Sequence, residues 1–179
     1  MMISEKLELV YIDVPKTASA TLDTFFGDND WELCKHSQGL KHGRIIPPYA
    51  KNYTKVASVR NPFDRVTSFY FFKKVKGQEK GSFDSFLDFL LSTKKYGAGY
   101  NDLKTYIHFP MCKYLKPTGY DIILRQENLA EDLKQIGFID PILGKRNKLD
   151  RPSWRDVYTK ERERKIISWA EEDFEEFGY

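Results

Sequence analysis

The sequence predicts an α/β fold in which helices cover both faces of a mainly parallel sheet, giving three layers. Apolar, β-branched runs alternate along the chain with segments of helical periodicity, which is the pattern of parallel strands joined by helices. Two of these runs end in a short polar turn that opens a helix. The chain has 179 residues and shows no internal repeat or low-complexity linker, so we expect a single domain over residues 1–179.

The first strand–turn–helix unit begins with the apolar run Leu7–Val14, which predicts a buried strand. The turn that follows carries one lysine, Lys16, and three hydroxyl side chains, those of Thr17, Ser19 and Thr21. We expect a helix over Ser19–Phe26, with Gly27 as its C-cap. A helix N-terminus directs backbone N–H groups at one point, which favours a bound phosphate or sulfate. The G-x-x-x-x-G-K-[ST] pattern of a Walker A loop is absent, and the alternative is an ordinary turn with a polar helix start.

The second unit begins with Lys55–Arg60, a short run whose β-branched residues predict a strand. Asn61-Pro62 then predicts a helix start, because asparagine is a good N-cap and proline suits the first helical position. Arg60 at the strand end and Ser68 in the helix can bind one phosphate, with the guanidinium binding two oxygens. The alternative is that Arg60 pairs with Asp64 and that Ser68 only fills a crowded helix face.

The later elements follow the same alternation of strands and helices. In chain order we expect a helix to Lys74 that ends near Gly77, a helix over Ser82–Lys94, a strand over Ile122–Leu124, a helix capped by Asn128, and a last helix from Thr159. The segment Ile107–Leu115 is ambiguous. Both polar turns then lie at carboxyl ends of parallel strands, where such folds bind their ligands.

At these turns the sequence resembles the sulfotransferases that use PAPS, 3′-phosphoadenosine 5′-phosphosulfate. Pro15–Thr21 reads P-K-T-A-S-A-T and resembles the family's 5′-phosphosulfate loop, P-K-T-[AG]-[ST]-[ST]-[ST]. Val59–Tyr70 reads V-R-N-P-F-D-R-V-T-S-F-Y and resembles the family's 3′-phosphate motif, R-[DN]-P-x-x-R-x-x-S-x-Y. The subgroup it resembles is the carbohydrate type, which includes hexuronic 2-O-sulfotransferases and small microbial or phage relatives.

Two later segments extend the resemblance to the end of the chain. Asp121–Leu133 is similar to the family's I-x-R-x-E-N-L strand and helix, and Asp173–Tyr179 is similar to its D-F-x-x-F-G-Y ending. Four motifs in the family's order are more specific than any one of them. One departure is Ala20, which stands where the family usually has Ser or Thr and so removes one donor, while Ser19 and Thr21 remain.

The resemblance implies a sulfotransferase fold, similar to that of P-loop NTPases, with PAPS as donor, PAP (3′,5′-ADP) as product and no metal. The family's 5′-phosphate loop corresponds to Lys16, Thr17, Ala18, Ser19, Ala20, Thr21 and Leu22. Lys16 would also be catalytic, donating to the bridging oxygen as negative charge builds there, while Arg60 and Ser68 would hold the 3′-phosphate. Two assignments stay open. Arg65 serves the nucleotide or pairs with a neighbour. Lys148 lies in a basic loop that, in the family, often closes over the nucleotide or touches an acidic acceptor, and that is otherwise a solvated charged loop.

The general base that takes the proton of the acceptor hydroxyl comes, in this family, from the segment between the two PAPS motifs. His36 is our first candidate, because histidine titrates near the working pH and small microbial relatives often place one there. His42 is the alternative, a carboxylate such as Glu32 is another, and a site without a base also stays open. His108 lies in an apolar neighbourhood, and we expect a structural role for it.

Composition excludes several other classes of protein. The chain carries 29 Lys and Arg against 26 Asp and Glu, and this mild excess fits anionic small molecules rather than nucleic acid. No apolar run approaches the ~20 residues that span a bilayer, and a strand begins almost at the first residue. We therefore expect a cytoplasmic protein of microbial or viral origin, unless the chain is a truncated Golgi enzyme. Cys34 and Cys112 lie in no C-x-x-C pair, and we expect reduced thiols, with a disulfide between them left open.

The sequence thus predicts a PAPS-dependent O-sulfotransferase whose partner is an acceptor with a free hydroxyl, by resemblance a saccharide, and neither nucleic acid nor a membrane. One rival is a P-loop-like kinase, which requires a Mg²⁺ ligand and a Walker lysine that the sequence lacks. Another is a nucleotide- or glycan-binding module without catalysis, which would bind PAP but show no turnover. The sequence does not identify the acceptor, the position sulfated or the oligomeric state.

Overall fold

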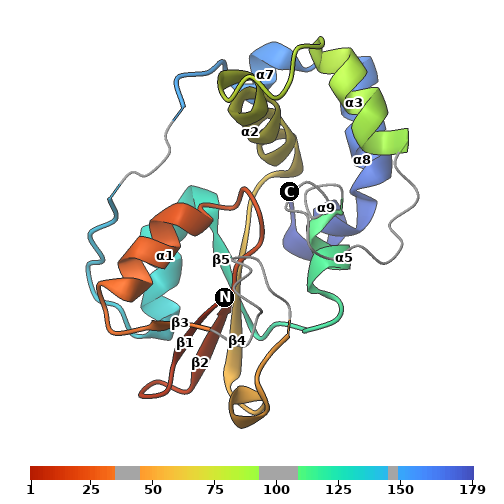
Figure 1. The fold of residues 1–179 in the computed structure, drawn as a ribbon. Helices are drawn as coiled ribbons and strands as arrows, with labels where there is room; N and C mark the ends of the chain where they lie inside the picture. Colours follow the sequence, from red (N-terminus) through yellow and green to blue (C-terminus); the bar gives the residue numbers. More distant parts are fainter. Residues whose placement is uncertain (35–44, 93–108, 145–148) are drawn as a thin grey trace. The chain divides into compact units, whose positions relative to one another are not determined.

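The structure, a computed structural model, describes residues 1–34, 45–92, 109–144 and 149–179 of the chain (Figure 1). These residues belong to two compact units. The sheet unit consists of residues 1–60 and 113–148, and the helical unit consists of residues 61–112 and 149–179. Of the three points at which the chain passes from one unit to the other, the second falls within the short helix α5 (Met111–Leu115). Each unit combines two separate stretches of sequence, and the single domain expected over residues 1–179 stays a prediction.

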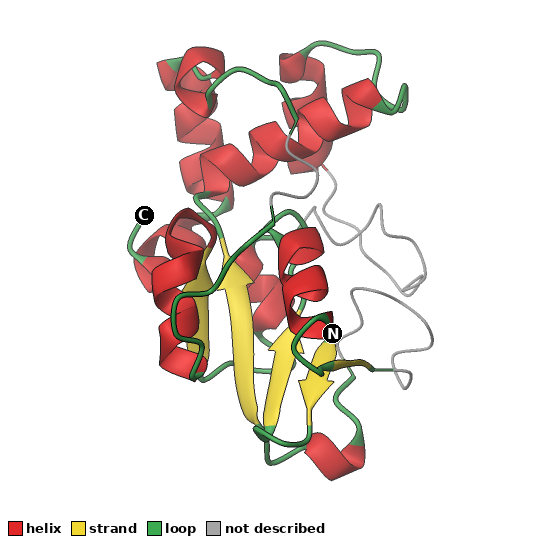
Figure 2. Cartoon of the chain, turned by 90° about the vertical axis from the view of Figure 1, so that its left-hand side faces the viewer, coloured by secondary structure: helices red, strands yellow, loops and turns green. Residues whose placement is uncertain are grey.

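The sheet unit is built on five strands in the order β3-β1-β2-β4-β5. Figure 2 draws the strands in yellow. Their bounds are β1 Met2–Ser4, β2 Leu9–Ile12, β3 Glu32–Leu33, β4 Thr54–Val59 and β5 Ile122–Arg125. β2 pairs with β4 and β4 with β5 in parallel, whereas β1 is antiparallel to both β2 and β3. The α/β fold is therefore confirmed, but the sheet is mixed, because β1 and β3 add an antiparallel edge that the sequence pattern did not indicate.

Both faces of the neighbouring parallel strands β2 and β4 are buried toward their carboxyl ends, whereas β5 is only partly buried. On one face, strand side chains pack against α1 (Ser19–Gly27), α6 (Leu129–Asp132) and the 3₁₀ turn Leu133–Ile136. This core includes Leu9, Tyr11, Leu22, Phe26, Trp31, Val56, Leu124, Leu129, Leu133 and Ile136. On the opposite face, Val10, Ile12, Ala57 and Val59 are also fully buried. Parallel strands of this kind are covered on both sides, as the sequence predicts.

The helical unit packs around aromatic side chains. Its helices are α2 (Pro62–Val75), α3 (Phe83–Ser92), α7 (Trp154–Val157), α8 (Lys160–Trp169) and α9 (Glu171–Phe177). Its core includes Phe63, Val66, Phe69, Tyr70, Phe83, Phe86, Leu87, Leu90, Tyr158 and Ile166. α2 begins as predicted, because the Asn61 side chain accepts hydrogen bonds from the N–H groups of Phe63 and Asp64 at 3.0 and 3.3 Å.

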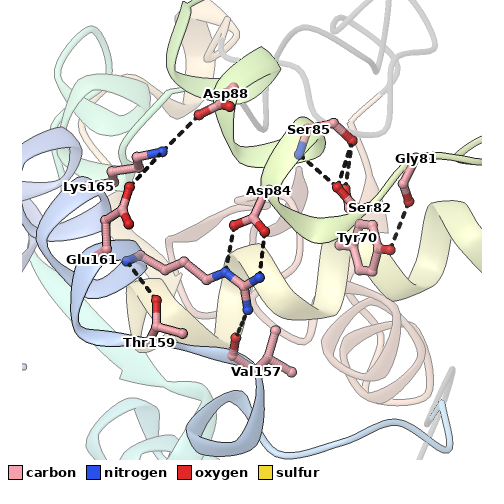
Figure 3. Close-up of polar contacts among 11 residues, drawn as sticks. Tyr70, Gly81, Ser82, Asp84, Ser85, Asp88, Val157, Thr159, Glu161 and Lys165 are labelled. Atoms are coloured by element: carbon pink, nitrogen blue, oxygen red, sulfur yellow. Dashed lines mark hydrogen bonds and ion pairs between the residues drawn. The ribbon is translucent and has the colours of Figure 1, made fainter.

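Ion pairs join α3 to α8 on the exposed side of the helical unit (Figure 3). Arg162 donates from Nε and Nη2 to the two carboxylate oxygens of Asp84, at 2.7 and 2.6 Å, and from Nη1 to the carbonyl of Val157. These hydrogen bonds hold the pKa of Asp84 below its ordinary value. One helical turn further on, Lys165 donates to Asp88 at 3.0 Å. A bidentate arginine pair fixes direction as well as distance, so it defines how the two helices align.

Several element boundaries differ from those expected. The strand expected over Leu7–Val14 is limited to Leu9–Ile12, and α1 runs one residue further than expected, to Gly27, with Asp28 as its C-cap. The last helix is interrupted at Ala170, which separates α8 from α9. Asn128 does not cap α6 through its side chain and instead donates to Asp132 at 3.1 Å. No helix in the described part of the chain is both long and apolar enough to cross a membrane.

The neighbouring residues Ile166 and Ile167 test the core of the helical unit. Ile166 is fully buried, whereas Ile167 is 47% exposed on the same helix. We expect Ile166→Ala to lower the free energy of unfolding by about 2–5 kcal/mol, through lost burial and the cavity left behind. Ile167→Ala, the matched control, should change it by less than about 1 kcal/mol. Urea unfolding followed by circular dichroism measures both, and equal losses would contradict this description of the core.

Candidate functional site

The sheet topology brings two of the predicted motifs to one edge of the sheet unit. Ile12 in β2 pairs with Ala57 in β4, and the two strands are parallel, so both end at the same edge. The loop that carries Lys16 follows β2, and Arg60 follows β4 directly. The carboxyl ends of neighbouring parallel strands are where α/β folds bind ligands. The candidate site of the sheet unit is therefore built from the residues after β2 and β4.

The backbone of the loop after β2 is held in an uncommon conformation. Lys16 and Ala18 have φ values of 70° and 71°, in the left-handed region that L-residues other than glycine rarely adopt. Each such residue costs about 1–2 kcal/mol. A turn in which left-handed residues alternate with ordinary ones can direct successive N–H groups at one anion. Glu8, Asp30 and Asp140 are also left-handed, but only Lys16 and Ala18 flank a single residue in this way among the described residues.

Helix α1 begins at the end of this loop with an alanine in the N-cap position. Ala18 has no side-chain oxygen with which to cap the helix, although its carbonyl accepts from the N–H groups of Thr21 and Leu22 at 2.9 and 3.1 Å. Because the N-cap has no side-chain acceptor, the N–H groups of the first two helical residues, Ser19 and Ala20, are the ones that can donate to an anion. The helix dipole adds partial positive charge at the same point. The loop and the helix start thus offer backbone donors together with the ammonium of Lys16.

Thr17 takes a different place from the one expected of a phosphate donor. Its side chain is fully buried, and its hydroxyl donates to the carbonyl of Val14 at 2.7 Å. The same hydroxyl lies 2.6 Å from the Ser58 hydroxyl on β4, which in turn lies 2.8 Å from the hydroxyl of Tyr11 on β2. The Thr17 hydroxyl therefore anchors the loop, and a contact between the backbone N–H of Thr17 and a phosphate stays a prediction.

Leu22, the last residue of the predicted 5′-phosphate loop, contributes its side chain to the core. Its side chain is fully buried in the core of the sheet unit, so only its backbone belongs to the loop and helix start. Ser19 is 9% exposed at the first position of α1, while Ala20 and Thr21 are half-buried in the first turn. The roles predicted for Ser19, Ala20 and Thr21 stay predictions.

Arg60 contacts the loop directly. Its Nη1 donates to the carbonyl of Lys16 at 3.1 Å, which joins the end of β4 to the middle of the loop after β2. The two motifs that were identified separately in the sequence thus share a contact within the sheet unit. A guanidinium has five N–H donors in a planar fork, so it can bind a carbonyl and a phosphate at the same time.

Arg65 lies in the helical unit, in a position suited to a structural role. Its side chain is 1% exposed, and its Nη1 donates to the carbonyl of Phe109 at 2.9 Å. Asp173 on α9 accepts hydrogen bonds from the N–H groups of Met111 and Cys112, both at 2.7 Å. Burial raises the pKa of Asp173, while the Cys112 N–H and the charge of Arg65 oppose that rise. Of the two roles left open for Arg65, the structure favours pairing within its own unit.

The structure describes some of the other predicted residues, each in its own place, while the rest lie outside the described residues. Ser68 is 7% exposed on α2 of the helical unit. Asp64, near the start of the same helix, forms an ion pair with Arg151 at 2.6 Å. Glu32 is exposed on β3, and both cysteines are thiols. The candidate bases His36 and His42, together with His108 and Lys148, lie outside the described residues.

The sequence analysis did not identify Ser58 and Tyr11, whose buried hydroxyls form a hydrogen-bonded chain with the hydroxyl of Thr17. The available signal was a serine between two apolar residues, Ala57 and Val59, near the end of a predicted strand. A buried hydroxyl in such a place needs a partner, and the loop supplies it. Among the described residues, no group of three or more His, Cys, Asp or Glu could hold a metal ion. The expectation that no metal takes part stays a prediction.

The strained backbone at Ala18 gives a test of the loop. We expect Ala18→Gly to raise the free energy of unfolding by roughly 0.5–1 kcal/mol, because glycine relieves a left-handed strain of about 1–2 kcal/mol at an entropic cost of about 0.5–1 kcal/mol. Ala20→Gly, two residues further on within α1, should lower it by up to about 1 kcal/mol. Thermal and urea unfolding measure both variants. Equal destabilisation by the two substitutions would argue against a strained Ala18.

Comparison with known proteins agrees with this arrangement. The sequence model of one family, described as "Sulfotransferase family", matches residues 1–179, which is the whole chain. No curated protein and no solved structure gives a significant match. The family match covers both the loop after β2 and the arginine after β4, whose contact the structure describes. The chain therefore belongs to the sulfotransferase family.

Proposed function

We propose that this protein transfers the sulfuryl group of PAPS to a hydroxyl of an acceptor and releases PAP. The observation that carries the proposal is the contact between Arg60 and the carbonyl of Lys16. It joins a loop suited to one phosphate to an arginine suited to a second one. PAPS differs from most adenine nucleotides by carrying phosphate on both its 5′ and its 3′ oxygens, so a site with two neighbouring anion-binding groups fits it.

The donor set of the loop fits a 5′-phosphosulfate. Lys16 supplies a flexible cation, Ser19 and Thr21 supply hydroxyls, and the start of α1 supplies backbone N–H groups. The left-handed residues Lys16 and Ala18 support this role, because left-handed residues on either side of Thr17 can direct successive N–H groups at one anion. Ala20 contributes no hydroxyl, so the loop relies on Ser19, Thr21 and the backbone.

The reaction itself needs positioning and charge stabilisation. When PAPS is bound, it supplies an activated sulfuryl group whose bond to the bridging phosphate oxygen breaks as the acceptor oxygen bonds to sulfur. Lys16 would stabilise the negative charge that develops on the leaving phosphate, as a preorganised donor does in phosphoryl transfer. A general base would take the proton of the acceptor hydroxyl, and His36, with His42 as alternative, stays our prediction for it.

Arg60 is the proposed ligand of the 3′-phosphate, and the resemblance adds Ser68 to that role. An arginine binds a phosphate through two parallel hydrogen bonds, which distinguishes a 3′-phosphate from a bare ribose hydroxyl. For the acceptor we propose a saccharide hydroxyl, on the basis of the carbohydrate-type resemblance alone. We also propose a cytoplasmic enzyme that acts without nucleic acid or a membrane as partner.

Nucleotide titration tests the proposed donor site. In isothermal calorimetry without added metal, we expect 3′,5′-ADP to bind more tightly than 5′-AMP or ATP. Arg60→Ala should weaken the binding of 3′,5′-ADP about 10–100-fold, because hydrogen bonds to a charged group contribute about 1.5–3 kcal/mol. The same variant should change the affinity for 5′-AMP much less, so the preference for a 3′-phosphate should largely disappear.

The exposed residue Lys51 offers a control for loss of one positive charge, since Lys51→Ala should leave the preference for 3′,5′-ADP intact. Equal binding of 3′,5′-ADP and 5′-AMP by the unaltered protein would contradict PAPS as donor. Tight and metal-dependent binding of ATP would instead favour a kinase. Selective binding of 3′,5′-ADP without transfer to any acceptor would favour a binding module.

Lys16→Ala tests the proposed mechanism. Screening of saccharides with radiolabelled PAPS would first identify an acceptor. At saturating PAPS we expect the variant to lose about 10²–10³-fold in kcat, the usual effect of removing one donor that stabilises transition-state charge. Its unfolding midpoint should stay close to that of the unaltered protein, because Lys16 is not part of the core. Turnover within a few-fold of the unaltered enzyme would remove Lys16 from the chemical step.

A further inference from the structure

Three buried hydroxyl groups form a continuous chain beneath the loop after β2. The Tyr11 hydroxyl lies 2.8 Å from that of Ser58, and Ser58 lies 2.6 Å from the hydroxyl of Thr17. Thr17 completes the chain by donating to the carbonyl of Val14 at 2.7 Å. All three side chains are fully buried. Buried hydrogen bonds of this kind define the position of the groups they join, because no water competes for them.

The chain has one consistent direction. Thr17 has a single hydroxyl proton and gives it to Val14, so Ser58 donates to Thr17, and Tyr11 in turn donates to Ser58. Tyr11 can keep this role at neutral pH, because burial, with the nearby carboxylates of Asp13 and Asp23, raises its pKa well above the ordinary value. Each of the three hydroxyls thus donates one hydrogen bond, and the donors follow one another from Tyr11 through Ser58 and Thr17 to the carbonyl of Val14.

The chain acts on the strained part of the loop. Thr17 lies between Lys16 and Ala18, the two left-handed residues. Tyr11 and Ser58 belong to β2 and β4, the parallel neighbours whose carboxyl ends carry the candidate site. The hydroxyl chain therefore ties the middle of the loop to both strands. A left-handed conformation at a residue other than glycine persists only where such surroundings hold it.

We propose that Ser58 and Tyr11 are positioning residues for the 5′-phosphate loop, acting through the buried hydroxyl of Thr17. Neither side chain touches the nucleotide in this proposal. They set the direction of the backbone N–H groups around Thr17 and the place from which Lys16 extends. The inference rests on the proposed function, because it assigns the loop to the 5′-phosphate of the nucleotide, while Arg60 is assigned to the 3′-phosphate.

Three adenine nucleotides separate this role from a general effect on stability. The probes are 5′-AMP, 3′,5′-ADP and 3′-AMP, of which only the last lacks a 5′-phosphate. For Ser58→Ala we expect about 10-fold weaker binding of 5′-AMP and of 3′,5′-ADP, with the affinity for 3′-AMP unchanged within about 2-fold. Tyr11→Phe removes only the far end of the chain and should give a smaller loss of the same pattern, about 3-fold. Calorimetry, with competition for weak ligands, measures each affinity.

Ser4→Ala is the matched control. Ser4 is a buried serine on β1 of the same sheet, 4% exposed, and its hydroxyl accepts from the N–H of Leu7 at 3.3 Å. Because Ser4 pairs with Leu9, it lies at the amino end of β2, away from the loop. We expect Ser4→Ala to lower the unfolding midpoint about as much as Ser58→Ala does, while leaving all three nucleotide affinities unchanged.

The outcomes distinguish this inference from the proposed function. Equal weakening of all three nucleotides by Ser58→Ala, or no weakening of any, would overturn the positioning role while the donor site stands. Failure of the unaltered protein to prefer 3′,5′-ADP would overturn the proposed function, and the inference with it. If Ser58→Ala does not fold, Tyr11→Phe gives the same comparison, and its unchanged binding of 5′-AMP would overturn the proposal.

Discussion

The parallel register of β2 and β4 is the constraint on which the candidate site depends. It places Ile12 beside Ala57, so that the loop after β2 and the arginine after β4 emerge at one edge. It also places Ser58 on the face where it reaches both Tyr11 and Thr17. A slip of one residue would turn Ser58 to the opposite face of the sheet. Fixing the register therefore fixes the direction of the loop, its anchor and its contact with Arg60 together.

The loop is maintained against its own local preferences. Lys16 and Ala18 adopt backbone angles that favour glycine, and α1 begins at an alanine, which is a poor N-cap. The core of the sheet unit has to supply the stability that the loop lacks. In this core the rings of Phe26 and Trp31 stack with their centroids 4.2 Å apart. Functional loops in proteins are often locally unfavourable, and the well-packed core around them supplies the stability that the loop lacks.

Local signals predicted the parts of the structure that depend on local physics. Asn61 and Pro62 predicted the start of α2, and the apolar run before Pro15 predicted β2. Both could be predicted because helix caps and strand ends depend on residues that are adjacent in the sequence. The antiparallel strand β1 was missed, since three residues before a charged turn carry little periodicity. The burial of Arg65 and Thr17 was missed for another reason. An arginine or a threonine can bind a ligand or a partner within the protein, and only distant residues such as Phe109 and Ser58 decide between the two.

Because the two units alternate along the chain, the core of the helical unit can form only late in synthesis. The helical unit draws on residues 61–112 and 149–179, with a stretch of the sheet unit between them in the chain. Phe63 stacks on Trp154 at 4.9 Å, and Tyr158 and Phe174 pack on the same ring. Ribosomes add about 5–20 residues per second, so α2 and α3 leave the ribosome seconds before these partners exist. During that interval the ring of Phe63 lacks the three aromatic side chains that pack on it in the folded protein, so this part of the core can form only after the end of the chain is made.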